Sequence, residues 1–180
     1  MEVTLKYRSR IVIGAIAPFL SKEKRILDIG CGNGVVSDEI RSHFGCQLVG
    51  TDILSYLRRP IEFVLMKTPD ALEFGDKAFD FGLFIDVLHH MPFERQIALI
   101  KEARRVCRGV LIFEVKPTLL AKTVDFLANQ LHNHRMPLAL THRTKQEWMR
   151  LFEEQRITAE FFEVRKPAFW PSTNYLFFLP

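Results

Sequence analysis

The sequence predicts an α/β fold of three layers, with helices on both faces of a mostly parallel sheet. Apolar runs of strand length alternate along the chain with stretches of helical pattern. The runs are apolar throughout, as expected for strands of a parallel sheet that is buried on both faces. The last two strands have to lie antiparallel to form a hairpin, so the predicted sheet is parallel except at its C-terminal end.

The expected elements follow one another in a regular order. Buried strands are predicted at residues 25–30, 47–52, 61–66, 79–86 and 109–115. Helices are predicted at residues 5–20, 33–44 and 92–106. In the last of these helices, Leu99 and Ala103 can line one side while Lys101 stays in solvent. This is the pattern of a helix that packs on a sheet.

The C-terminal third continues the alternation. A helix is predicted at about 118–131. Another begins after Thr144, because Thr144 and Glu147 have the spacing of a capping box. Two further strands, which complete a seven-stranded sheet, are predicted at residues 157–164 and 173–179.

Length and composition indicate one globular domain spanning residues 1–180. The chain is 48% hydrophobic and 26% charged, which is ordinary for a globular protein. Its net charge of +4 comes from scattered basic residues, so a nucleic-acid surface is not indicated. Its three cysteines have no CxxC or CxxH spacing, which argues against a disulfide framework and fits a reducing compartment, the cytoplasm.

The N-terminal stretch RSRIVIGAIAPFL pairs basic residues with an apolar run, as a signal peptide does. The charged residues SKEKR follow where a cleavage site would need small ones. About ten apolar residues are also only half of what a bilayer-spanning helix requires. The stretch is therefore expected to be the first helix of the domain rather than a leader or a membrane anchor.

The first predicted strand ends in a turn with three glycines. The stretch ILDIGCGNGVVS, residues 26–37, places Gly30, Gly32 and Gly34 between a strand and a helix. Either the turn is simply tight, or a ligand comes closer to its backbone than a Cβ would allow. Asp52 ends the next strand, and in open α/β sheets a nucleoside lies across such strand ends with its ribose held by the acid.

Glycine spacing separates two classes of nucleoside-binding protein. The dinucleotide fingerprint of oxidoreductases is G-x-G-x-x-G, whereas here the last glycine comes one position early, at Gly34. Asp28 also precedes Gly30 by two residues. Its carboxylate would repel a pyrophosphate and suits a ligand with a cationic end, so a nicotinamide or flavin enzyme is disfavoured.

These segments resemble a known family. LDIGCGNG followed by VGTD is similar to motif I and the acidic second-strand end of class I S-adenosylmethionine-dependent methyltransferases, and FDFGLFIDVLHHM is similar to their fourth-strand segment. The resemblance covers nearly the whole chain and points to the small methyltransferases of quinone biosynthesis and secondary metabolism. It implies a Rossmann-like fold, S-adenosylmethionine as cofactor and methyl transfer as the activity.

The resemblance also implies a role for each matching position. Asp28 and the backbone of the turn would face the methionine part of the cofactor, Asp52 would hold the ribose, and the end of the fourth strand would meet the methionine amine. The turn residues are Gly30, Cys31, Gly32 and Gly34, the residues flanking adenine are Ile53 and Leu54, and those at the end of the fourth strand are Ile85 and Asp86.

Two segments depart from the family pattern. The acid and small residue expected near the adenine amine fall two positions late, at Asp70 and Ala71, and Thr68 stands where the acid is expected. Asp70 and Ala71 are therefore the candidates for that contact. The Lys-Pro-Gly-Gly turn before the fifth strand is shortened to CRGV, so Gly109 alone is expected to make the turn.

Two histidines, His89 and His90, follow the fourth strand on the cofactor side of the sheet. His89 is the candidate catalytic residue, as a general base or a donor that positions the acceptor, because its ordinary pKa near 6.5 suits the task. His90 is expected to pack at the start of the next helix. The motif HNHR at 132–135 lacks partners at metal-binding spacing, so no metal is predicted.

The segments around the predicted site supply candidates for its walls. Residues 117–143 are a candidate lid over the active site, and Phe169 and Trp170 are a candidate wall for a partly apolar acceptor. The side chains of Tyr7, Arg8 and Arg10 on the first helix either close the cofactor pocket or face solvent.

The methyl acceptor is expected to be a small molecule. The (Asp/Asn)-Pro-Pro-(Tyr/Phe) sequence of amino-methylating nucleic-acid enzymes is missing after the fourth strand, no Pro-Cys pair occurs, and the catalytic core fills the chain. The alternative is a non-catalytic scaffold with this fold, or a cofactor-binding subunit of a complex that methylates a macromolecule.

Overall fold

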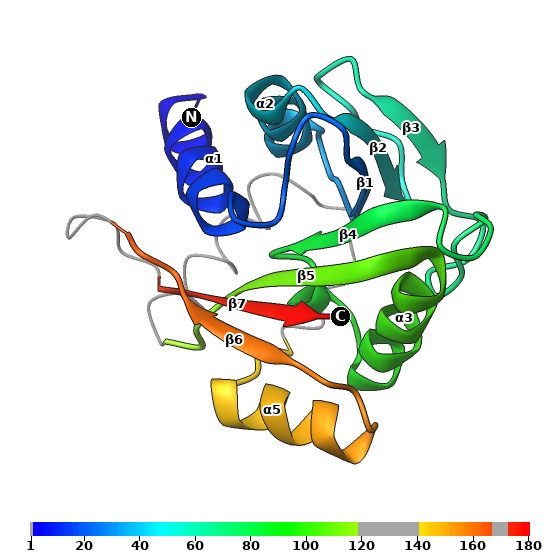
Figure 1. Ribbon diagram of the computed structural model, residues 1–180, viewed down its shortest axis with the longest axis vertical. Helices are drawn as coiled ribbons and strands as arrows, with labels where there is room; N and C mark the ends of the chain where they lie inside the picture. Colours follow the sequence, from blue (N-terminus) through cyan, green and yellow to red (C-terminus); the bar gives the residue numbers. More distant parts are fainter. Residues whose placement is uncertain (1, 119–140, 167–172) are drawn as a thin grey trace.

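A twisted sheet of seven strands runs through the middle of the molecule (Figure 1). The computed structural model describes residues 2–118, 141–166 and 173–180. The strands are β1 (Arg25–Ile29), β2 (Gln47–Asp52), β3 (Glu62–Leu65), β4 (Phe79–Ile85), β5 (Cys107–Val115), β6 (Glu160–Glu163) and β7 (Asn174–Leu179).

The strands lie in the order β3-β2-β1-β4-β5-β7-β6. The first five pair in parallel, whereas β7 is antiparallel to both β5 and β6. The predicted fold, with a mostly parallel seven-stranded sheet and an antiparallel C-terminal hairpin, is confirmed. Because β1 pairs with both β2 and β4, strands are added on one side of β1 up to β3 and on its other side from β4 onwards. Ligands bind at such a switch in strand order in open α/β sheets.

Helices cover both faces of the sheet and make the three layers (Figure 1). They are α1 (Glu2–Ile16), α2 (Val35–Phe44), the short 3₁₀ helix η1 (Leu88–His90), α3 (Phe93–Val106) and α5 (Lys145–Glu154). Side chains of α1 and α2 form one buried core, including Ile16 and Ile40. Side chains of α3 and α5 form the other, including Ile100 and Trp148. None of the described helices is long and apolar enough to cross a membrane.

The observed ends of two helices differ from the predicted ones. α1 ends at Ile16 rather than at residue 20, because Pro18 disfavours helical backbone at the residue before it. α2 begins at Val35 rather than at residue 33, because Gly34 has the left-handed φ of 75° and cannot be a helical residue. At the start of α5, the predicted capping box between Thr144 and Glu147 is confirmed.

The prediction that Gly109 makes a turn before the fifth strand is wrong. α3 ends at Val106 and β5 begins directly at Cys107, so Gly109 lies inside the strand. A Cβ on Gly109 would lie 2.8 Å from a ring carbon of Phe178 and 3.1 Å from one of Phe81. The rings of Phe81 on β4 and Phe178 on β7, the two strands that flank β5, therefore leave no room for a side chain at Gly109.

Several predictions fall outside the described residues. They concern the helix at 118–131, of which residue 118 alone is described, the HNHR loop at 132–135, most of the candidate lid at 117–143, and the wall residues Phe169 and Trp170.

Candidate functional site

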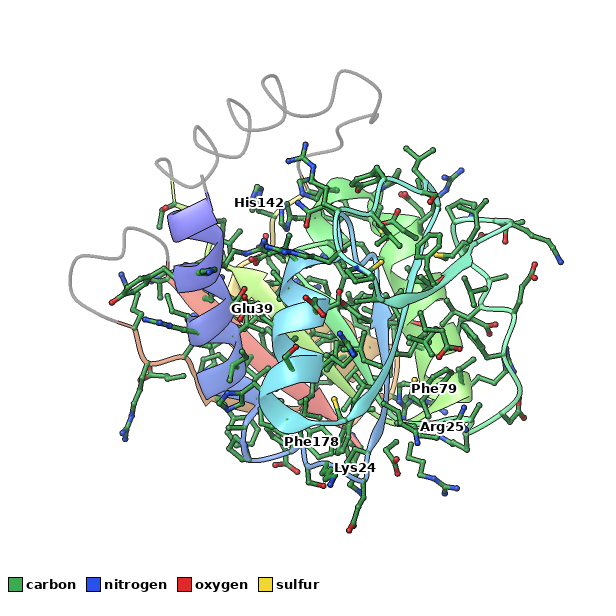
Figure 2. All side chains as sticks on the ribbon, turned by 90° about the horizontal axis from the view of Figure 1, so that it is seen from above. Lys24, Arg25, Glu39, Phe79, His142 and Phe178 are labelled. Carbon is green, nitrogen blue, oxygen red and sulfur yellow. The ribbon has the colours of Figure 1, made fainter. Side chains whose placement is uncertain are left out.

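The carboxyl ends of β1, β2, β4 and β5 meet at one edge of the sheet. His142 lies at this edge, whereas Lys24 and Arg25 lie at the opposite edge, where β1 begins (Figure 2). The glycine turn follows β1, and Asp52 ends β2. The fold therefore places the main predicted site residues on one side of the molecule.

All three glycines of the turn have left-handed backbone. The φ angles are 76° at Gly30, 59° at Gly32 and 75° at Gly34, a conformation that residues with a Cβ rarely adopt. A Cβ on Gly30 would overlap with Val87, and one on Gly34 would lie 2.9 Å from Leu57. Packing against Val87 and Leu57 accounts for the lack of a Cβ at these two glycines.

Gly32 is the glycine of the turn that has room beside it. The atom nearest to a Cβ built there is the hydroxyl of Tyr56, at 3.8 Å. Its amide donates a hydrogen bond of 2.9 Å to Oδ2 of Asp52, and Oδ1 of Asp52 accepts one of 3.4 Å from the amide of Leu54. The turn and the acid that the sequence predicted for one site are thus in direct contact.

Asp28 lies buried in β1 on the face covered by α2. Its Oδ2 accepts a hydrogen bond of 2.6 Å from the hydroxyl of Ser37. The pKa of Asp28 is raised to about 6: burial is the largest cause, the Ser37 hydrogen bond opposes it, the charge of Asp52 adds to it and the charge of Arg8 opposes it. Asp28 is therefore a carboxylate that a nearby cation would stabilise.

The side chain of Cys31 points into the protein. Its sulfur lies 2.8 Å from the position that a Cβ on Gly50 would take, and burial raises the pKa of its thiol far above the usual range. The side chain of Cys31 therefore packs against β2, and only the backbone of Cys31 contributes to the surface of the turn. Burial likewise raises the pKa of Asp52, although the amides of Gly32 and Leu54 lower it.

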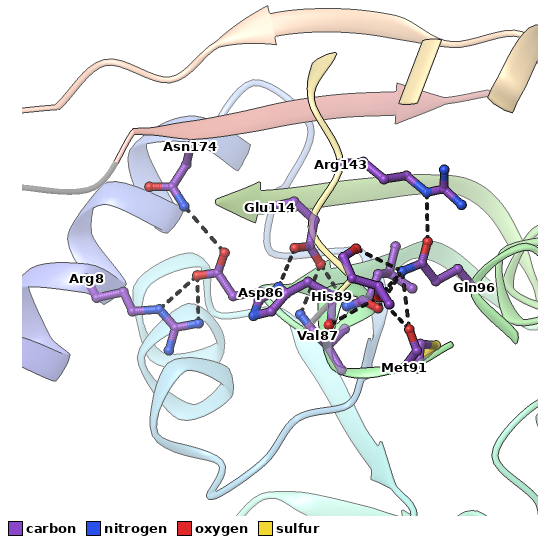
Figure 3. A network of polar contacts seen from close by, with 11 residues as sticks. Arg8, Asp86, Val87, His89, Met91, Gln96, Glu114, Arg143 and Asn174 are labelled. Atoms are coloured by element: carbon purple, nitrogen blue, oxygen red, sulfur yellow. Dashed lines mark hydrogen bonds and ion pairs between the residues drawn. The ribbon is translucent and has the colours of Figure 1, made fainter. Parts of the chain in front are cut away.

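Asp86 follows β4 with a left-handed φ of 50°. Its Oδ2 accepts hydrogen bonds from Nε and Nη2 of Arg8 at 3.1 and 2.9 Å, and its Oδ1 accepts one from Nδ2 of Asn174 at 3.3 Å (Figure 3). Burial raises the pKa of Asp86, and the Arg8 guanidinium lowers it. Arg8 thus faces the site from α1 and binds the carboxylate at the end of β4.

His89 is paired with a glutamate of the neighbouring strand. Its Nδ1 lies 2.6 Å from Oε2 of Glu114, and the two side chains are 4% and 2% exposed (Figure 3). Oε1 of Glu114 accepts hydrogen bonds from the amides of Val87 and Leu88 at 3.1 and 2.7 Å. Because an ionised carboxylate only accepts hydrogen bonds, this network assigns the proton to Nδ1 and makes Nε2 the basic nitrogen.

The ring of His89 is stacked against His142, with centroids 4.6 Å apart. The backbone near His142 is fastened to η1, since the amide of Thr141 donates a hydrogen bond of 2.9 Å to the His89 carbonyl. Buried Gln96 extends this connection, as its Nε2 donates to Oγ1 of Thr141 at 2.8 Å and its Oε1 accepts from Nε of Arg143 at 2.9 Å (Figure 3). The described end of the candidate lid is therefore bound directly behind His89.

The other predicted cofactor residues are Ile53, Leu54, Asp70, Ala71 and Ile85. Ile53 and Leu54 are 42% and 41% exposed beside Asp52, and Ile85 is buried at the end of β4. Asp70 and Ala71 are exposed in the loop after β3. Across the described ranges, no hydrogen bond joins Asp70 to the turn or to Asp52.

Glu114 and Asn174 are not among the site residues predicted from the sequence, which leaves the orientation of Arg8 undecided. The signal for Glu114 is a lone acid in the apolar strand GVLIFEV, because a buried carboxylate requires partners. Nothing in the sequence shows that Asn174, 88 positions away, contacts Asp86. Tyr7 and Arg10 face a groove of about 630 Å³ between α1 and β6, which no predicted cofactor residue lines.

The residues fit an adenosyl cofactor with a cationic amino acid end. The space beside Gly32 is one that a Cβ would fill, and Asp52 stands at its edge. Asp28 and Asp86 offer negative charge to an ammonium group, and Arg8 offers a guanidinium to a carboxylate. Among the described residues, no group of three or more His, Cys, Asp or Glu is arranged to hold a metal ion.

Comparisons with known proteins agree with this geometry. A family model described as a methyltransferase domain matches residues 5–164, whereas no protein with a curated description matches the chain. An S-adenosylmethionine-dependent methyltransferase from Archaeoglobus fulgidus is similar in structure, with a TM-score of 0.66, 16% identity, and 97% and 96% of the two chains covered.

Two other similar structures come from complexes. One, from Haloferax volcanii, contains the Trm112 methyltransferase activator and a methyltransferase, with a TM-score of 0.72, 12% identity, and 97% and 89% coverage. The other is the Burkholderia thailandensis 1,6-didemethyltoxoflavin-N1-methyltransferase with 1,6-didemethyltoxoflavin and S-adenosylhomocysteine, with a TM-score of 0.65, 15% identity, and 97% and 76% coverage. The chain therefore belongs to the methyltransferase family, with the fold of class I S-adenosylmethionine-dependent methyltransferases, and the resemblance seen in its sequence is confirmed.

Proposed function

We propose that this methyltransferase transfers the methyl group of S-adenosylmethionine to a small-molecule acceptor at the carboxyl edge of β4 and β5. The observation that carries the proposal is the contact between Gly32 and Asp52, which unites the open part of the turn with a buried acid. S-adenosylmethionine supplies a methyl group on a sulfonium, which is already electrophilic. The protein therefore has to align the reactants and exclude water.

The chain's own residues divide the binding of this cofactor between them. Asp52 would accept hydrogen bonds from the ribose hydroxyls, and Ile53 and Leu54 would flank the adenine, with Asp70 and Ala71 nearest its amine. The backbone from Gly30 to Gly34 and the carboxylate of Asp28 would face the methionine part. At the end of β4, Ile85 and Asp86 would meet its ammonium group, and Arg8 would meet its carboxylate.

In this proposal, His89 would receive a proton from the acceptor at Nε2. Glu114 holds Nδ1 at 2.6 Å and stabilises the imidazolium that forms. Because His89 as a whole is 3% exposed, its ring is also shielded from bulk water. Glu114 is thus a positioning residue, and Glu114→Gln is expected to shift the pH profile of kcat and to leave KM for the cofactor unchanged.

A small-molecule acceptor is supported by one of the similar structures. The Burkholderia thailandensis enzyme holds 1,6-didemethyltoxoflavin, a small molecule. The second candidate function is a catalytic subunit that needs a partner protein, and it is favoured by the Haloferax volcanii complex with an activator. In both cases the cofactor site is the same, and the acceptor or the partner differs.

Labelling separates the two candidates. The purified protein is incubated with methyl-labelled S-adenosylmethionine and an extract of its host, and the products are separated by size. Label in the small-molecule fraction, dependent on Asp52, supports the proposal. Label in polymers contradicts a small-molecule acceptor, and label that appears only after a host protein fraction is added supports the partner-dependent subunit.

A further inference from the structure

The loop from Ile53 to Ile61 is fastened onto the glycine turn. The amide of Arg58 donates a hydrogen bond of 2.8 Å to the carbonyl of Asn33. Two side chains of the loop pack on Gly34, since Leu57 and Ile61 lie 2.9 and 3.4 Å from the position of a Cβ there. The loop is therefore held in place, and so is Tyr56 within it.

Tyr56 directs its hydroxyl towards the open part of the turn. The oxygen is the atom nearest to a Cβ built on Gly32, at 3.8 Å. Burial, together with the nearby charge of Asp52, raises the pKa of Tyr56 to about 12. The phenol therefore keeps its proton at neutral pH, and within the part of the chain that the structure describes it makes no hydrogen bond.

A hydrogen-bond donor and an acceptor therefore both lie beside Gly32. Asp52 offers carboxylate oxygens, which accept hydrogen bonds from hydroxyl groups. A ribose hydroxyl both donates and accepts, so it can donate to Asp52 and accept from a phenol at once. The hydroxyl of Tyr56 can supply the hydrogen bond that the ribose hydroxyl accepts, because the backbone amide of Gly32 is already bonded to Asp52.

We propose that Tyr56 is a cofactor-binding residue, whose hydroxyl donates a hydrogen bond to a ribose hydroxyl of the adenosyl group and whose ring covers that group over Gly32. The inference rests on the proposed function and adds to it a residue that discriminates ribose from deoxyribose. A site whose donor is left unpaired rejects the analogue that lacks the matching hydroxyl.

The test uses S-adenosylhomocysteine and its 2′-deoxy and 3′-deoxy analogues, titrated by calorimetry into wild type, Tyr56→Phe and Tyr56→Ala. Tyr175→Phe on β7, on the face covered by α5, is the matched control. We expect Tyr56→Phe to weaken S-adenosylhomocysteine by about three- to tenfold, and Tyr56→Ala to weaken it more. For the deoxy analogue that lacks the contacted hydroxyl, Tyr56→Phe and wild type should bind equally.

Each other outcome has a definite meaning. Equal binding of S-adenosylhomocysteine by wild type and Tyr56→Phe overturns the inference and leaves the proposed function standing. An equal loss for all three ligands shows that the hydroxyl does not meet the ribose, which also overturns it. A Tyr56→Phe protein that melts below wild type without ligand shows that the hydroxyl holds the loop instead. Failure of wild type to bind S-adenosylhomocysteine defeats the proposed function itself.

Discussion

The side chain of Val87 fills the space beside Gly30, so that a Cβ built on Gly30 would overlap with its Cγ2 atom. This contact joins the turn after β1 to the segment after β4, and β1 and β4 are neighbouring strands in the sheet. It separates a glycine required by packing from Gly32, which has open space beside it. Glycine is thus required at the two positions of one motif for different physical reasons, and substitutions at the two positions can tell these reasons apart.

Alanine substitutions at Gly30 and Gly32 should differ in their main effect: Gly30→Ala should mainly reduce stability, and Gly32→Ala should mainly reduce cofactor affinity. Gly30→Ala combines overlap with left-handed backbone, so the free energy of unfolding should fall by about 3 kcal/mol or more. Gly32→Ala should lose about 1–2 kcal/mol, from the backbone alone, and should bind S-adenosylhomocysteine at least tenfold more weakly. Urea unfolding and calorimetry measure the two effects. If both variants lost the same stability and the same affinity, the distinction would be wrong.

Asp28→Asn should stabilise the folded protein and weaken cofactor binding. The folded pKa of about 6 lies above the ordinary value near 3.9, so the folded state binds more protons and this carboxyl favours folding below about pH 4. That contribution is lost as pH rises through 6. At pH 8, Asp28→Asn should therefore raise the free energy of unfolding by up to about 3 kcal/mol.

The measurement for Asp28 is urea unfolding of both proteins between pH 4 and 8. The gain from Asp28→Asn should be small at pH 4 and grow as pH rises to about 7. A variant that is less stable than wild type at pH 8, or a difference that does not depend on pH, contradicts the account.

The stability of the protein should depend on the acceptor atoms of Glu114 more than on its charge. Glu114→Ala leaves the partly buried amide of Val87 and the buried amide of Leu88 without their acceptor, so the free energy of unfolding should fall by about 2–4 kcal/mol. Glu114→Gln keeps one oxygen and should lose clearly less. Chemical unfolding of the two variants checks this, and equal losses would show that the carboxylate contributes through charge.

Arg8→Leu should destabilise the protein mainly above acid pH. Arg8 lowers the pKa of Asp86 against the effect of burial, so its removal raises that pKa further and leaves a buried charge unpaired whenever Asp86 is ionised. We expect a loss of about 1–2 kcal/mol at pH 8 for this partly exposed pair, and less at pH 5. Thermal melts at both pH values test it.

Two controls define the Arg8 result. Lys24→Leu removes an exposed ion pair with Asp80 at the other edge of the sheet and should change the melting temperature little at either pH. Asp86→Asn in the Arg8→Leu background should restore stability at pH 8, since asparagine tolerates the left-handed φ of 50°. A loss for Arg8→Leu that is larger at pH 5 would contradict this explanation.

The sequence predicts strands and turn chemistry well because both depend on local pattern. Continuous apolar runs identify the five parallel strands, and the glycines with Asp52 identify the edge where a ligand fits. The start of β5 is missed because the segment CRGV reads as a shortened turn before the strand. Gly109 instead lies inside the strand, where the rings of Phe81 and Phe178 leave no room for a Cβ.

The polar network of the site depends on pairs that are distant in the chain. Glu114 is 25 positions from His89, and Asp86 is 78 from Arg8. Such pairs follow from strand order and helix placement, which no local pattern encodes. The same holds for Gly30, whose partner Val87 is known only once β1 and β4 are seen side by side.

In the proposed function, Asp52 and the glycine turn hold the adenosyl group of the cofactor. Calorimetric titration of S-adenosylhomocysteine into wild type, Asp52→Ala and Asp80→Ala tests this most directly, because Asp80 is an aspartate of the opposite edge that pairs with Lys24. We predict that wild type and Asp80→Ala bind alike and that a folded Asp52→Ala binds at least tenfold more weakly. Equal affinity of all three proteins, or no binding by wild type, would contradict the account.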